Sequence, residues 1–197
     1  IWFFLIAGYG QYDKNVSPDN PHLIRLIKSI AASDTVGIHP SFASNSTPEL
    51  VRSEINQLAE ILDRPITLSR QHYLLIRLPD TYRTLLHLGI HDDYSMGFAD
   101  RPGFRAGIAS PFTFFDLEGN LATSLVIHPF MVMDTTLKQY LHLNPDQAIE
   151  QISRIVEQVR LVNGTFTSLW HNESLSEWKS WRGWSRVYHE LLSIAKK

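Results

Sequence analysis

The chain has 197 residues, of which 44% are hydrophobic and 19% charged, enough apolar material for a packed core and unlike the composition of disordered chains. With 18 Lys and Arg against 20 Asp and Glu, its formal net charge is −2, so charge gives no reason to expect nucleic acid or an anionic membrane as a partner. The absence of cysteine excludes disulfides and thiolate metal sites, and leaves any metal to His, Asp, Glu or Asn. We expect a single domain over residues 1–197 that binds a small ligand.

Strand-like and helical patterns alternate along the chain. The opening run IWFFLIA is too short to cross a bilayer and predicts a strand that is buried on both faces. Further strands are expected within 35–39, 66–73, 123–132 and 165–172, and helices over 17–32, 46–64, 79–88, 144–164 and 184–197. The segment 90–107 shows no clear period, and no hairpin signal appears. This order predicts an α/β fold with parallel strands.

In α/β folds, ligands bind at the carboxyl ends of the strands, so the polar residues that follow apolar runs are the candidates for a site. They are His39, Arg70, Gln71, His72, Tyr73, Asp92, Asp93, His128, His171 and Asn172. Each has a simpler interpretation, since a histidine at a strand end is often only a hydrogen-bonded loop residue. The tryptophans at 178, 181 and 184 are compatible with packing of the last helix or with a sugar-binding rim.

Common catalytic motifs are missing. The sequence contains no GxGxxG, P-loop, GxSxG or HExxH pattern, so it gives no support to a dinucleotide site, a nucleotide site, a serine hydrolase or a zincin. What the residues alone indicate is an α/β domain with a polar His/Asp/Arg site at its strand ends.

The ordered segments VGIHPSFASN, SRQHYLLIRLP, GIHDDYSMGFADRPGFRAG, PFTFFDL, FMVMDTTL and LWHNESL…WRGW are similar to a known family. Together they resemble the polysaccharide deacetylase-like proteins of carbohydrate esterase family four, the NodB-homology type, in a bacterial subgroup with RQHYL, GFRAG and LWHN segments. The resemblance implies a distorted (β/α) barrel with a divalent metal, usually zinc. It also implies hydrolysis of N-acetyl groups on an amino-sugar polysaccharide by a metal-bound water.

The resemblance implies roles for five residues. His39 matches a metal-ligating histidine, but Ala43 stands where a second one is usual, and His72 is the candidate to replace it, with Asn45 or Ser44 as further oxygen donors. Arg70 matches an arginine that orients the catalytic base. His171 matches the acid histidine, and Asp93 the aspartate that keeps it protonated.

The first family motif, which supplies the base and a metal ligand, is expected upstream of Ile1. Asp13 follows the first apolar run but in the wrong neighbourhood to replace it. We therefore expect the chain to lack the first barrel strand and to have little activity alone.

Two alternatives remain open at this stage. The first is a degenerate, non-catalytic domain of the same fold that binds glycan or serves as a scaffold. The second is a hydrolase of another C–N bond, since the loops that choose the substrate cannot be interpreted from sequence.

Overall fold

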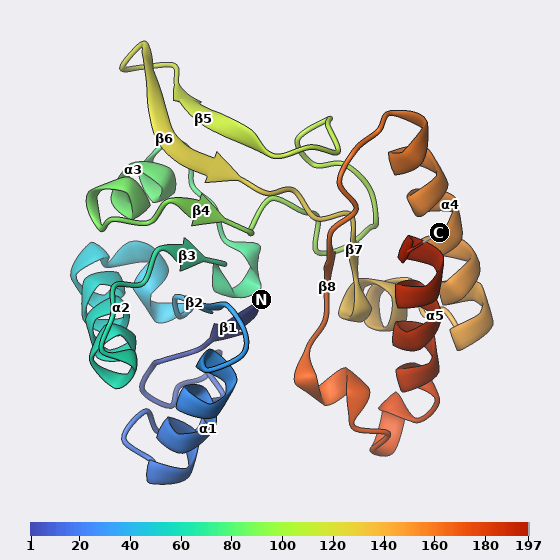
Figure 1. The fold of residues 1–197 in the computed structure, drawn as a ribbon, viewed down its shortest axis with the longest axis horizontal. Coiled ribbons are helices and arrows are strands. Elements are labelled where there is room, and N and C mark those ends of the chain that lie inside the picture. The colour runs from blue at the N-terminus through green and yellow to red at the C-terminus, as the bar shows by residue number, and fades with distance from the viewer. Residues whose placement is uncertain (197) are drawn as a thin grey trace. The chain divides into compact units, whose positions relative to one another are not determined.

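The computed structural model describes residues 1–196 and divides into two compact units. Unit 1 comprises residues 1–95 and 112–127, and unit 2 comprises residues 96–111 and those from 128 onward. Figure 1 shows the elements of both. Among the described residues, none of the helices has the length and apolar character of a membrane span. The expectation of one domain over 1–197 stays a prediction.

Unit 1 is a sheet with three helices. Its strands are β1 (Trp2–Phe4), β2 (Val36–Ile38), β3 (Leu68–Ser69), β4 (Asp92–Asp93), β5 (Phe112–Asp116) and β6 (Leu121–Ile127). Its helices are α1 (Pro21–Ala31), α2 (Pro48–Leu62) and α3 (Asp80–His87), with short helical turns η1 (Ala43–Ser46) and η2 (His72–Leu74). The sheet order is β1-β2-β3-β4-β6-β5, in which every pair is parallel except β5 with β6.

The parallel register of β1 and β2 determines the position of His39, the candidate residue that follows β2. Phe3 pairs with Gly37, and a Cβ at Gly37 would come within 2.7 Å of the Phe3 ring and 2.8 Å of the Leu68 carbonyl oxygen. Only glycine fits between these neighbours. The ladder then continues by one bond, as the His39 amide donates to the Phe4 carbonyl at 2.8 Å.

The antiparallel pair β5–β6 corrects the expectation that the chain has no hairpin. Its connection contains Asn120, whose φ of 48° supplies the left-handed turn that an Asn-Gly pair would otherwise signal. Arg83 connects α3 to the edge strand β5, because its Nε and Nη2 donate hydrogen bonds to Asp116 Oδ2 and Oδ1 at 2.6 and 2.8 Å. The Arg83 guanidinium lowers the pKa of Asp116, with help from the Gly119 amide.

Unit 2 packs two helices on a short parallel pair of strands. It contains β7 (Val132–Met133), η3 (Thr136–Tyr140), α4 (Pro145–Leu161), β8 (Ser168–Leu169), η4 (Asn172–Leu175), η5 (Lys179–Trp181) and α5 (Trp184–Lys196). The helices α4 and α5 run side by side (Figure 1). Their shared core includes Ile152, Val156, Trp181, Trp184 and Val187.

Local sequence signals account for where the helices begin. The helix expected over 144–164 begins with a capping box, in which Asn144 Oδ1 accepts from the Gln147 amide and Gln147 Oε1 accepts from the Asn144 amide, both at 3.0 Å. The expected start of α1 at Ser17 is wrong. Asn20 is the cap, accepting from the His22 amide at 2.8 Å, with Pro21 as the first helical residue.

The α/β class with a parallel sheet is therefore confirmed. The barrel is not, because the hydrogen bonds of the described residues join the strands into two separate sheets.

Replacing Arg83 by Ala should lower the melting temperature by several degrees, because the nearly buried Asp116 carboxylate then loses its bidentate partner. Arg52→Ala, at an exposed position of α2, is the matched control and should change it little. Equal effects of the two substitutions, measured by circular dichroism, would show that the pair does not hold the hairpin.

Candidate active site

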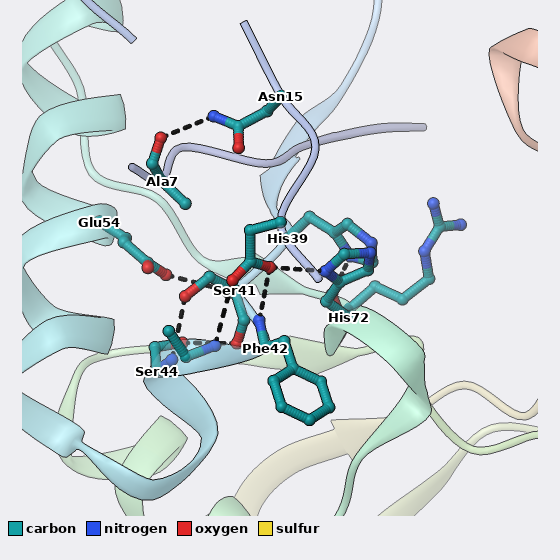
Figure 2. A network of polar contacts seen from close by, with 11 residues as sticks. Ala7, Asn15, His39, Ser41, Phe42, Ser44, Glu54 and His72 are labelled. Atoms are coloured by element: carbon teal, nitrogen blue, oxygen red, sulfur yellow. Dashed lines mark hydrogen bonds and ion pairs between the residues drawn. The ribbon is translucent and has the colours of Figure 1, made fainter. Parts of the chain in front are cut away.

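Three side chains meet in unit 1 beyond the carboxyl ends of β1, β2 and β3. They are Asp13, His39 and His72, here called the histidine cluster (Figure 2). The His39 and His72 rings lie with centroids 4.8 Å apart, and Asp13 Oδ1 lies 2.9 Å from His72 Nδ1. The prediction that strand ends bring His39 and His72 together agrees with this geometry.

Asp13 is the centre of the cluster and is 4% exposed. Its Oδ1 accepts from the Phe42 amide at 2.8 Å and from His72, while Oδ2 accepts from the Ala43 amide at 3.2 Å. Burial works to raise the pKa of Asp13, but these hydrogen bonds outweigh it and the pKa is lowered. The side chain is therefore a carboxylate, and the expectation that Asp13 lies in the wrong neighbourhood is corrected.

The contacts of the two histidines determine where their protons are. His39 Nδ1 bonds the backbone carbonyl of Arg70, which can only accept, so Nδ1 carries the hydrogen. His72 Nδ1 faces the ionised Asp13 carboxylate, so it carries a hydrogen as well. In a neutral imidazole this leaves the lone pair on Nε2 in both rings. Metal-binding histidines are typically held in the same way, by a carboxylate or a carbonyl on the opposite nitrogen.

The donor set fits a zinc site only in part. Two imidazoles of fixed tautomer suit the metal, but within residues 1–196 no group of three His, Cys, Asp or Glu side chains is arranged to hold a metal ion. Asp13 instead uses both oxygens for hydrogen bonds. The metal ligands His39 and His72 therefore stay a prediction.

Arg70 and Asp93 lie at the ends of β3 and β4. The Arg70 guanidinium carbon is 4.6 Å from the centre of the Phe3 ring. Asp93 is fully buried, where its Oδ2 accepts from Ser69 Oγ at 2.7 Å and from Ser95 Oγ at 2.8 Å. The base-orienting role of Arg70 remains a prediction.

His171 lies in unit 2 and has a partner that sequence reasoning missed. Asp134, which is fully buried after β7, accepts from the Nδ1 of His171 through Oδ1 and from its backbone amide through Oδ2, both at 2.7 Å. The resemblance implied Asp93 as the carboxylate partner of His171, but the carboxylate that contacts the His171 ring is that of Asp134. The sequence contained a signal for Asp134, since this residue directly follows an apolar run as the other candidates do.

The tryptophans divide between core and surface of unit 2. Trp181 and Trp184 are buried and stack edge to face with ring centroids 5.5 Å apart, so they pack the last helix. Trp178 is 68% exposed.

Glu54 of α2 supports the loop that Asp13 holds. It is 3% exposed, its Oε2 accepts from the Ser41 amide at 3.0 Å, and its Oε1 has no hydrogen-bond partner in the described structure. Figure 2 shows Glu54 and Ser41 beside the cluster. Burial raises the pKa of Glu54, and the nearby Asp13 charge adds to this effect.

Glu54→Gln should therefore gain stability relative to the natural chain as pH rises. Because the folded-state pKa of Glu54 is above 4.5, its value in the unfolded chain, the natural protein loses stability as pH rises from 4.5 through the folded-state pKa. The neutral amide does not titrate. Melting temperatures at pH 4.5 and at neutral pH test this, with Glu60→Gln, at an exposed position of the same helix, as control. A difference between the Glu54→Gln variant and the natural chain that is the same at both pH values would contradict it.

Comparisons with known proteins add to this geometry. No family model and no curated protein matches the sequence. Two crystal structures, each described as a "putative polysaccharide deacetylase", resemble the fold. The one from Mycobacterium smegmatis has a TM-score of 0.61 and 18% identity, over 89% of this chain and 62% of that chain.

The second is described as involved in O-antigen biosynthesis in Bordetella bronchiseptica, with a TM-score of 0.48 and 13% identity over 87% of this chain and 66% of that one. This second likeness is too weak to support an argument. At 62% the chain spans less than two thirds of the Mycobacterium protein's length. The first likeness shows that the chain has the fold of the Mycobacterium structure described as a "putative polysaccharide deacetylase".

Proposed function

We propose that the chain is a hydrolase that removes N-acetyl groups from an amino-sugar polysaccharide. The observation that carries the proposal is the histidine cluster, in which a carboxylate and two imidazoles of fixed tautomer meet beyond the ends of parallel strands. The fold is that of a structure described as a "putative polysaccharide deacetylase".

Amide hydrolysis sets chemical requirements that these residues can meet. The amide carbonyl is a poor electrophile, and the departing amine must receive a proton. In the proposal, the Nε2 atoms of His39 and His72 hold a divalent metal, with zinc as the best match for imidazole ligands. When bound, zinc would polarise the amide oxygen and acidify a water molecule.

The remaining roles belong to the chain's own side chains. Asp13 fixes the His72 ring through Nδ1, which leaves Nε2 as the working nitrogen. In unit 2, Asp134 fixes Nδ1 of His171 in the same way, which leaves Nε2 of this half-exposed ring as the nitrogen that would face a substrate. We propose that His171 is the general acid, which donates a proton to the departing amine.

One observation favours a second candidate function. Ala43 occupies the position of the usual second histidine, and the Ala43 amide is used to bind Asp13. A degenerate domain that binds glycan without hydrolysing it would have this arrangement. It differs from the first proposal in a single measurable property, the release of acetate.

His171→Ala should reduce acetate release from N-acetylated chitin oligosaccharides by about 10²- to 10⁴-fold, the usual contribution of a general acid. His189→Ala, an exposed histidine of α5, is the matched control and should keep the natural rate. Acetate is measured with a coupled enzymatic assay. If His171→Ala keeps the natural rate, the assignment of His171 as acid is wrong. If the natural chain binds the oligosaccharides but releases no acetate, the glycan-binding alternative holds.

Removal of either proposed imidazole ligand should abolish metal binding. The natural chain, dialysed after exposure to zinc, should keep zinc in elemental analysis, whereas His39→Ala and His72→Ala should lose it. His87→Ala, at an exposed position of α3, is the control and should keep it. Equal zinc content in all four proteins, or none in the natural chain, would contradict the ligand assignment.

A further inference from the structure

Three aromatic rings pack against one another beside the histidine cluster. Tyr12 and Phe42 lie with ring centroids 4.2 Å apart at 34°, and Tyr73 meets both edge-on, at 6.0 Å from Tyr12 and 5.5 Å from Phe42. Offset and edge-to-face arrangements of this kind are the favourable ones for aromatic pairs. We call Tyr12, Phe42 and Tyr73 the aromatic platform.

The platform is packed but remains open to solvent. Tyr12 is 42% exposed and Tyr73 54% exposed, although each contacts the two other rings of the platform. A contiguous group of exposed rings differs from a single exposed aromatic residue, which needs no explanation. Tyr12 and Tyr73 therefore keep solvent-exposed apolar surface.

The backbone that presents Tyr73 is in an uncommon conformation. Tyr73 and Leu74 have φ values of 54° and 55°, in the left-handed region that bulky residues avoid. Leu74 is 8% exposed, and its amide donates to the Gln71 carbonyl at 3.1 Å. Buried Leu74 thus stabilises a turn that leaves Tyr73 exposed, and strain of this kind is concentrated at ligand sites.

Each of the three platform residues is connected to a residue of the histidine cluster. Tyr12 precedes Asp13 in the chain, the Phe42 amide donates to Asp13 Oδ1 at 2.8 Å, and the Tyr73 ring lies 4.6 Å from the His72 ring. Figure 2 shows the hydrogen bonds that join Phe42 and His72 to the same carboxylate. A molecule that reacts at the cluster would therefore extend over these rings.

We propose that the aromatic platform binds one pyranose ring of the substrate, with the C–H face of the sugar lying on one exposed tyrosine ring, Tyr12 or Tyr73, and the other tyrosine, which is perpendicular to it, contacting the edge of the sugar. A pyranose has an apolar face of axial C–H groups and an equatorial rim of hydroxyl and acetamido groups. The rings match that face, while the adjoining cluster matches the polar rim. This inference rests on the proposed function for the identity of the ligand as a sugar.

The test measures sugar binding separately from hydrolysis. Isothermal titration calorimetry of the full chain with N-acetylated chitin oligosaccharides should give a Kd that Tyr12→Ala and Tyr73→Ala each raise by about tenfold, the loss of one ring contact. Tyr12→Phe and Tyr73→Phe keep the rings and should bind as the natural chain does. Tyr9→Ala is the matched control, because Tyr9 is 75% exposed outside the platform.

The outcomes separate this inference from the proposed function. Acetate release with a KM unchanged in both Ala variants would overturn the platform and leave the proposed function standing. Oligosaccharide binding that the Ala variants weaken, without acetate release, would support the platform and refute the hydrolase. No binding of N-acetylated chitin oligosaccharides or cello-oligosaccharides by the natural chain would overturn the platform.

Discussion

The buried carboxylate of Asp13 is the interaction on which the site depends. Three hydrogen bonds join it to the loop after β2 and to His72 after β3, so one side chain ties together segments about 30 and 59 residues away. A carboxylate removed from water must be compensated in this way, because an unpaired buried charge is strongly unfavourable. Any change that neutralises Asp13 would release the loop, His72 and the adjoining Phe42 together.

The same device recurs in both units. In each case a group that can only accept a hydrogen bond accepts one from the Nδ1–H of a histidine. This contact fixes the orientation of the ring and leaves the lone pair of a neutral imidazole on Nε2. The acceptor is the Arg70 carbonyl for His39, Asp13 for His72 and Asp134 for His171. Fixing the tautomer in advance matters for a ligand or a proton donor, because the wrong tautomer can do neither.

Part of the site could be predicted from sequence, because the polar residue after a buried strand has a defined position. That rule identified His39, His72 and His171. It missed Asp13, which follows β1 by nine positions in an irregular segment, since its partners Phe42 and Ala43 are distant in sequence. Long-range contacts of this kind leave no local pattern.

Two further features of the structure, Asp134 and the β5–β6 hairpin, were not predicted from the sequence. Asp134 obeys the strand-end rule, but the pattern predicts one strand over 123–132, whereas β6 ends at Ile127 and β7 begins at Val132. The β5–β6 hairpin turns through a left-handed Asn120 without the usual Asn-Gly pair. In both cases the tertiary arrangement, rather than residue type, decides where a strand ends.

The most direct test of the account is the rate of acetate release from N-acetylated chitin oligosaccharides by the natural chain and by Asp13→Asn. An amide at this position keeps the size of the side chain, but its NH2 group replaces one acceptor oxygen. The variant therefore loses either the bond from the Ala43 amide or, in the other orientation, the bonds from the Phe42 amide and His72 Nδ1–H. We predict release by the natural chain and a loss of at least about tenfold in a variant that circular dichroism shows to be folded. Equal rates for the two proteins, or no release by either, would contradict the account.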